Sequence, residues 1–198
     1  DYYASRGLGD VYKRQAQRQD AIDKLMPHIP DGMKVVVGAE VYVTRYMFNG
    51  DDFSCACYGN SNYILTEFAY TSQFSSHTME YFVKLTENYN MIPVLTHVER
   101  YPALINDPSI IGELKDMGVI IQTNTNSYTK KASFFSKLKL IKLIKGGYID
   151  VIGSDAHSLT HNDPRTFTEA LDFISAKCGQ STVRKMMSNA EEIFNSAL

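Results

Sequence analysis

Residues 92–101 read Ile-Pro-Val-Leu-Thr-His-Val-Glu-Arg-Tyr, an apolar run that leads directly into a histidine, a glutamate and an arginine. Four further segments are rich in apolar and β-branched residues: residues 35–43, 63–68, 119–125 and 148–154. Most of the five are continuous apolar runs and not strict alternations, which is typical of strands buried on both faces of a parallel sheet. The sequence therefore predicts five parallel strands.

Helical patterns lie between these strands. Apolar residues recur at helical spacing in residues 78–88 and 132–145, and Asp107-Pro108 has the form of an N-cap followed by a first-turn proline. The remaining predicted helices cover residues 16–26, 109–117, 166–177, 182–187 and 190–197. Strands alternating with helices across short connections predict an α/β fold in a single domain.

Composition narrows the class of protein. The chain has 198 residues, 44% of them hydrophobic, and a net charge of −2. Without a basic surplus, nucleic-acid binding and adhesion to an anionic membrane are not favoured, and no apolar run is long enough for membrane insertion. Three cysteines form no disulfide framework, and no secretion signal opens the chain, so we expect a cytoplasmic protein.

The first fifteen residues differ from the rest. Residues 1–15 have no clear apolar periodicity, and Gly7 and Gly9 are expected to break any helix there. We predict that residues 1–15 are a non-native segment and that the domain covers residues 16–198.

Polar side chains follow most of the predicted strands. In parallel α/β folds, functional groups gather at the carboxyl ends of strands, and here those ends carry Glu40, Glu67, His97, Asn124 and Asp155. A consistent supply of ligand-type residues to one edge of the sheet indicates a functional site.

Asp155-Ala-His157 is the sharpest of these motifs. One residue separates the two side chains, so in an extended chain both point the same way. A carboxylate and an imidazole suit Mn, Zn or Fe. The alternative is that Asp155 caps a turn and His157 is solvated. His97 and Glu40 support the metal interpretation more weakly, because a lone histidine at a strand end is usually structural.

Arg100 follows His97 by three residues at the same edge. A guanidinium beside a metal cluster is suited to binding phosphate, and the alternative is an ion pair with Glu99 or Glu67. Cys178 and Arg184 have the Cys-x5-Arg spacing of cysteine phosphatases, but a predicted helix precedes the cysteine where that loop requires a strand, so we do not assign this chemistry.

Four motifs together resemble a known superfamily. They are Gly-Ala-Glu40-Val-Tyr, Tyr-Ile-Leu-Thr-Glu67-Phe, Ile-Pro-Val-Leu-Thr-His97-Val-Glu-Arg100-Tyr and Val-Ile-Gly-Ser-Asp155-Ala-His157. They are similar to the bacterial PHP (polymerase and histidinol phosphatase) domains, and above all to the manganese-dependent protein tyrosine phosphatases of capsular and exopolysaccharide regulation.

This resemblance implies a distorted, TIM-like (β/α)7 barrel with a trinuclear Mn2+ site, for which Fe or Zn is also possible. Glu40, His97, Asp155 and His157 would be metal ligands, with Arg100 binding phosphate. The implied reaction is attack of a metal-activated hydroxide on phosphotyrosine. The implied substrate is a phosphotyrosine protein, in particular an autophosphorylating bacterial tyrosine kinase.

The chain departs from the family pattern at several points. Val98 replaces the usual proline, and the arginine expected soon after His157 has only Arg165, in altered order, as a candidate for phosphate binding. The family's N-terminal His-x-His and Thr-Pro-His ligands are absent. We therefore expect an N-terminally truncated barrel of about five strands with an incomplete site, which binds metal poorly and is largely inactive.

Two other functions are compatible with the same sequence motifs. One is a PHP phosphatase or phosphodiesterase acting on a small molecule such as histidinol phosphate. The other is a degenerate, non-catalytic PHP scaffold, although the presence of four ligand-type residues argues against decay of the site.

Overall fold

A single five-stranded parallel sheet forms the centre of the protein. The computed structural model describes residues 8–48, 54–156 and 162–198. The strands run in the order β1-β2-β3-β4-β5, and every neighbouring pair is parallel. Their bounds are β1 Glu40–Tyr42, β2 Tyr63–Glu67, β3 Ile92–Leu95, β4 Ile120–Asn124 and β5 Val151–Gly153. The predicted α/β class and all five strands are confirmed; the structure does not confirm closure into a barrel, because within the described ranges β1 and β5 each pair with only one strand.

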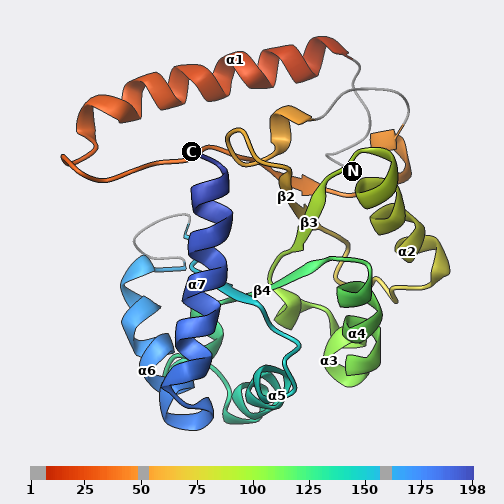
Figure 1. The fold of residues 1–198 in the computed structure, drawn as a ribbon, viewed down its shortest axis with the longest axis vertical. Helices are drawn as coiled ribbons and strands as arrows, with labels where there is room; N and C mark the ends of the chain where they lie inside the picture. Colours follow the sequence, from red (N-terminus) through yellow and green to blue (C-terminus); the bar gives the residue numbers. More distant parts are fainter. Residues whose placement is uncertain (1–7, 49–53, 157–161) are drawn as a thin grey trace.

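Helices surround this sheet (Figure 1). The α-helices are α1 Leu8–Leu25, α2 Ser76–Val83, α3 Pro102–Asn106, α4 Pro108–Asp116, α5 Phe134–Lys145, α6 Phe167–Cys178 and α7 Gln180–Ser196. Short helical turns are η1 Met26–His28, η2 Arg45–Phe48, η3 Ser54–Ala56, η4 Lys84–Asn88, η5 Val98–Arg100, η6 Thr125–Tyr128 and η7 Pro164–Thr166. Figure 1 shows α2, α3 and α4 on one side of the sheet and α6 and α7 on the other.

Local signals explain several helix ends. The Asp107 carboxylate accepts a hydrogen bond from the Ser109 backbone N–H at 3.1 Å, which confirms the predicted N-cap of α4. Helix α5 ends at Lys145 with Gly146 as its C-cap, and Gly147 follows in the left-handed region with φ +74°, where glycine carries no steric penalty.

Two helix predictions are wrong. Residues 182–187 and 190–197 belong to one helix, α7, because the polar Asn189 between them donates from its side chain to the Asp150 carbonyl at 2.9 Å and is thus accommodated. The expected break at Gly9 is also wrong, since α1 begins at Leu8 and continues through it. A glycine inside a helix costs only about 1 kcal/mol relative to alanine, which a long helix tolerates.

The two faces of the sheet differ. The register aligns Glu40 with Leu65 and Leu65 with Val94, so Glu40, Glu67 and Thr96 share one face. The opposite face joins the main hydrophobic core. The core includes Phe82, Leu95, Leu104, Ile111, Leu114, Ile121 and Ile174, each fully buried. Burial on both faces is confirmed for β3 and β4, whereas β2 alternates between buried and partly exposed residues.

Candidate metal centre

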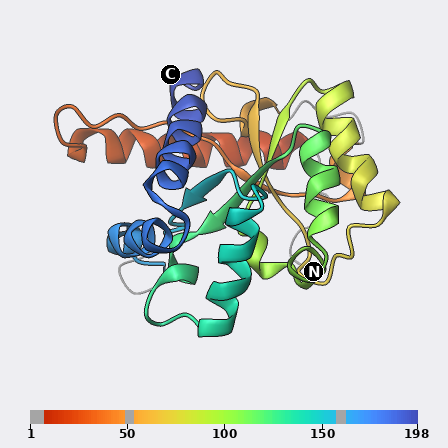
Figure 2. The same cartoon turned by 60° about the horizontal axis from the view of Figure 1, so that its bottom comes forward.

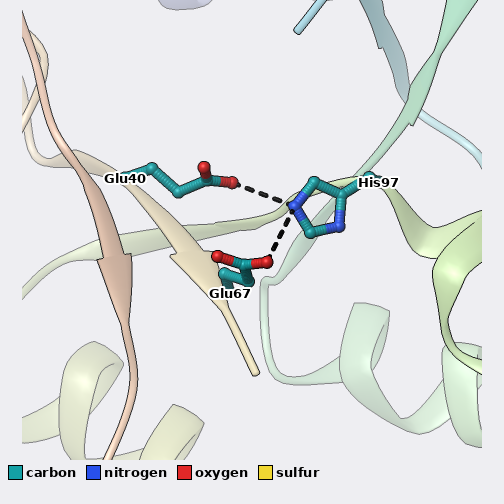
Figure 3. A group of neighbouring side chains, drawn as sticks. All are labelled: Glu40, Glu67 and His97. Carbon is teal, nitrogen blue, oxygen red and sulfur yellow. Dashed lines mark ion pairs between the residues drawn. The ribbon is translucent and has the colours of Figure 1, made fainter. Parts of the chain in front are cut away.

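Three neighbouring strands bring two carboxylates and an imidazole together (Figure 3). Glu40 lies on β1, Glu67 ends β2, and His97 follows β3. The His97 Nε2 atom lies 3.1 Å from Glu40 Oε1 and 3.5 Å from Glu67 Oε1. One ligand atom from each residue falls within 4.8 Å of the other two. Two atoms that are each about 2.1 Å from the same ion lie at most about 4.2 Å apart, so the two His97 distances fit a shared cation.

The backbone at His97 turns sharply to make this arrangement. Its φ of 38° and ψ of 54° lie in the left-handed region, which is uncommon for a residue with a side chain. The His97 backbone N–H donates to the side-chain Oε1 of Gln122 at 2.5 Å, so β4 holds the turn in place. Strained conformations of this kind concentrate at functional sites. The strand β3 ends at Leu95, before this turn, so the predicted strand over residues 92–98 is too long.

Gln122 is itself held by its neighbours. Its Nε2 donates to the side-chain oxygen of Asn124 at 2.8 Å and to the Thr123 carbonyl at 3.0 Å. A Cβ atom added at Gly153 would lie 2.7 Å from that nitrogen, so only glycine fits there without displacing Gln122.

Negative charge is concentrated at the three-residue group. The hydrogen bond with His97 lowers the pKa of Glu40, and the Thr96 hydroxyl adds a 2.6 Å hydrogen bond to the same carboxylate. Burial, followed by the charge of Glu40, raises the pKa of Glu67. A bound cation would relieve this repulsion.

The donor chemistry also fits a metal. Two carboxylates with one imidazole are a set preferred by Mn, Fe and Zn. His97 is 1% exposed, and its second nitrogen, Nδ1, has no hydrogen-bond partner within the described ranges. A buried structural histidine normally satisfies its polar atoms, so the orphaned nitrogen is more consistent with a functional role.

Arg100 lies at the same edge of the sheet but pairs differently from the sequence alternatives. Its Nη2 donates to Asp155 Oδ2 at 2.8 Å and not to Glu99 or Glu67, the partners that the sequence suggests for an ion pair. Its Nη1 lies 3.4 Å from the Tyr70 hydroxyl. About a third of the Arg100 side chain, 32%, is exposed, so the guanidinium is both oriented and accessible.

Asp155 anchors this part of the edge. The same Oδ2 atom accepts hydrogen bonds from the side-chain amides of Asn124, at 3.0 Å, and Asn162, at 2.9 Å. Asp155 has a φ of 50°, so its backbone is also left-handed. It is not a member of the three-residue group, yet it lines the same cavity of about 390 Å³ as Glu40 and His97.

Helix α7 forms another wall of that cavity. Ile193 and Phe194 contribute apolar side chains opposite the polar groups at the strand ends. The helix is fixed at its end, where the Asn60 backbone N–H donates to the Ala197 carbonyl at 3.3 Å. The cavity therefore combines polar groups at the strand ends with apolar side chains from both the strands and α7.

The remaining predicted residues have different outcomes. His157 lies outside the described residues. Arg165 forms an ion pair with Asp163 at 2.6 Å, and 76% of its side chain is exposed, so it stays a predicted phosphate ligand. Glu67 was not among the predicted ligands, although its place at the end of a predicted strand is the same signal that marked Glu40.

Glu99 was also missed. Its carboxylate accepts hydrogen bonds from the Thr123 hydroxyl at 2.9 Å, the Asn124 backbone N–H at 3.1 Å and the Ser127 hydroxyl at 3.2 Å. Burial raises the pKa of this carboxylate. Through these bonds Glu99 ties η5, which carries Arg100, to the end of β4.

Several known proteins are similar to this chain in sequence. The chain is 27% identical over 172 residues to tyrosine-protein phosphatase CpsB of Streptococcus pneumoniae, covering 83% of this chain and 69% of that protein. It is 26% identical over 131 residues to putative tyrosine-protein phosphatase CapC of Staphylococcus aureus, covering 66% of this chain and 51% of that protein.

A solved structure has the same fold. It comes from the crystal structures of YwqE from Bacillus subtilis and CpsB from Streptococcus pneumoniae, described as unique metal-dependent tyrosine phosphatases, with a TM-score of 0.63 at 23% identity. The match covers 72% of this chain and 56% of that one, so the chain spans little more than half the length of the solved relative.

The family model for capsular polysaccharide synthesis proteins, CpsB/CapC, matches residues 3–195. This match agrees with the resemblance carried by the four strand-end motifs. The chain therefore belongs to the CpsB/CapC family of capsular polysaccharide synthesis.

Proposed function

We propose that this protein takes part in metal-dependent hydrolysis of phosphotyrosine on proteins, in the regulation of capsular or exopolysaccharide synthesis. The observation that carries the proposal is the convergence of Glu40, Glu67 and His97 from three strands, with His97 Nε2 facing both carboxylates. The names of the relatives in Streptococcus pneumoniae and Staphylococcus aureus support the same reaction.

In this proposal Glu40, Glu67 and His97 hold the metal, and Asp155 and His157 complete the set. Mn2+ is the proposed ion, on the basis of the family resemblance and an oxygen-rich donor set. When bound, the metal supplies a hydroxide nucleophile at neutral pH and neutralises charge on the phosphoryl oxygens.

Arg100 is the proposed phosphate-binding residue. Its planar guanidinium matches phosphoryl oxygens in a bidentate geometry and stabilises charge that develops in the transition state. Asp155 and the Tyr70 hydroxyl orient the side chain before substrate arrives. Tyr70 also places its ring 5.9 Å from the Arg100 guanidinium carbon.

The proposal extends to the closure of the sheet, the substrate and the location of the protein. We infer that the five-stranded sheet is part of a (β/α)7 barrel, since consecutive parallel strands in sequence order are the arrangement that such a barrel requires. The proposed substrate is an autophosphorylated bacterial tyrosine kinase, and the proposed location is cytoplasmic. No helix in the described part of the chain is long and apolar enough to cross a membrane.

Metal binding tests the centre directly. Titration calorimetry with Mn2+ on the 198-residue chain should give a weak binding isotherm, because the family's His-x-His and Thr-Pro-His ligands are absent, and Glu40→Gln and Glu67→Gln should each lower the affinity at least about tenfold. Glu80→Gln is the matched control, because Glu80 is an exposed carboxylate on α2. Affinity that does not change in the two site variants would refute the ligand assignment.

Activity is tested on the 198-residue chain extended by the N-terminal His-x-His and Thr-Pro-His ligand segments that the family pattern carries. Hydrolysis of a phosphotyrosine peptide should require Mn2+ and should exceed hydrolysis of histidinol phosphate. Faster turnover of histidinol phosphate would favour the small-molecule alternative. A protein that binds Mn2+ but hydrolyses neither substrate would refute the phosphatase proposal.

A further inference from the structure

Helix α5 has an unusual outward face. Its sequence is FFSKLKLIKLIK, and its inward side chains Leu140, Ile141, Leu143 and Ile144 are buried in the core. Three large apolar side chains nevertheless point to solvent in its first turns. Phe134 is 63% exposed, Phe135 is 77% exposed and Leu138 is 38% exposed. A helix already packed by one face normally carries polar residues on the other.

These three residues form one patch. Phe134 and Leu138 are four residues apart and so adjacent on the helix surface, and the two phenyl rings have centroids 6.0 Å apart in an edge-to-face arrangement. Single exposed apolar residues are common, but adjacent ones mark interaction sites. Figure 2 shows α5 at the lower edge of the molecule.

Lysines surround the patch. Between residues 129 and 146 the chain has six lysines and no acidic residue. Five of them are exposed: Lys130, Lys131, Lys139, Lys142 and Lys145. Lys137 is engaged, since its Nζ donates to the Thr129 carbonyl at 3.1 Å.

Few acidic groups face this segment from the neighbouring helix. Helix α6 carries Glu169, which accepts from the Lys130 backbone N–H at 2.8 Å, and the exposed Asp172. The net charge of −2 for the whole chain therefore conceals a local positive surface. The expectation that the protein does not adhere to anionic membranes rested on that average.

We propose that the outward face of α5 binds the surface of an anionic phospholipid bilayer. The two phenyl rings enter the boundary between headgroups and acyl chains, and the lysines contact lipid phosphates. Exposed aromatic and aliphatic residues framed by lysines are the pattern of interfacial helices, and electrostatic attraction adds about 1 kcal/mol per lysine near the membrane, a factor of about five in affinity. The contact is peripheral and requires no membrane-spanning segment.

A bilayer explains the patch better than an acidic protein segment. A groove between α3 and α5 could hold a peptide, and Phe135 lines it together with Ile105 and Lys139. Phe134 and Leu138 do not line that groove. A peptide there would leave both side chains in water, whereas a planar membrane surface covers the whole patch.

Vesicle sedimentation tests the proposal on the 198-residue chain. We expect the protein to partition onto phosphatidylglycerol vesicles and not onto phosphatidylcholine vesicles, with weaker partition at high salt because the Debye length falls from about 10 Å at 0.1 M to about 3 Å at 1 M. The double variant Phe134→Ser/Phe135→Ser should lower the partition coefficient about tenfold or more. Lys142→Gln should lower it about fivefold.

Matched controls separate the patch from general surface effects. Met33→Ser replaces an apolar residue that is 60% exposed elsewhere, and Lys185→Gln removes an exposed lysine on α7; both should bind as the wild type does. Circular dichroism checks that all variants are folded.

Three results would overturn the proposal. They are equal binding to both lipids, equal binding by the double phenylalanine variant, and binding to poly-glutamate without binding to phosphatidylglycerol vesicles, which would point to an acidic protein partner. The assay measures no phosphatase activity, so its outcome is independent of the function proposed above.

Discussion

Tyr101 makes a contact whose removal has a predictable cost. Its side chain is fully buried, and its hydroxyl accepts a hydrogen bond from the Phe68 backbone N–H at 3.1 Å. Phe68 is 4% exposed and directly follows Glu67, so this bond fixes the chain where β2 delivers its carboxylate. The change Tyr101→Phe keeps the ring and removes only the acceptor.

The magnitude follows from what is left behind. A buried backbone N–H without a partner costs about 1–3 kcal/mol, and the cavity left by one oxygen atom adds little. Tyr128→Phe is the matched control. The Tyr128 hydroxyl, also fully buried, donates to Thr123 Oγ1 at 3.2 Å, and Thr123 keeps its own bond to Glu99 after the change. No backbone group is orphaned, so we expect a smaller loss of about 0.5–1.5 kcal/mol.

Urea unfolding followed by circular dichroism measures both variants. The midpoint should fall more for Tyr101→Phe at an unchanged m-value, and each kcal/mol should lower the melting temperature by about 2–4 °C in a domain of this size. Hydrogen exchange at the Phe68 amide should accelerate only in the Tyr101 variant. Equal destabilisation by the two variants, with Phe68 exchange unchanged, would refute the reasoning.

Three further changes have defined outcomes. Gly153→Ala should cost about 1–3 kcal/mol in urea unfolding and weaken Mn2+ binding in calorimetry, because the new Cβ displaces Gln122, whereas Gly112→Ala, whose nearest contact is 3.9 Å, should be neutral or stabilising. Burial raises the pKa of Glu99, so the contribution of Glu99 to stability should fall as pH rises above about 4.5, and the free energy of unfolding of the wild type should fall relative to that of Glu99→Gln; a difference between the two proteins that is constant with pH would contradict this. Arg100→Lys in the chain extended by the family's N-terminal ligand segments should raise KM for a phosphotyrosine peptide about tenfold, and an unchanged KM would exclude a role in phosphate binding.

Much of the architecture is predictable because strand burial is written locally in the sequence. Continuous runs such as Ile-Pro-Val-Leu ending at Leu95 indicate strands, and parallel strands place their carboxyl ends at one edge. That rule brings Glu40 and His97 together without knowledge of any contact. It applies equally to Glu67, which the ligand prediction left out.

Other features depend on tertiary contacts that no local pattern encodes. The left-handed turn at His97 requires an acceptor from Gln122, 25 residues away in the chain. Arg100 pairs with Asp155, 55 residues away in the chain, and not with the nearer carboxylates of Glu99 and Glu67. Glu99 likewise finds its three donors only after β4 is in place.

The position of α7 has a consequence for how the cavity exchanges with solvent. Ile193 and Phe194 line the cavity that also contains Glu40. The Ala197 carbonyl accepts a backbone hydrogen bond from Asn60. The preceding residue, Gly59, packs so closely that an added Cβ would lie 2.0 Å from the same carbonyl oxygen. Fraying of the last turn of α7 would therefore admit ions and water to the cavity from the α7 side, without any movement of the sheet. Amide exchange rates near Ala197 should then set an upper limit on how fast a metal can enter or leave by that route, and a fusion tag attached after Leu198 should alter those rates before it alters affinity.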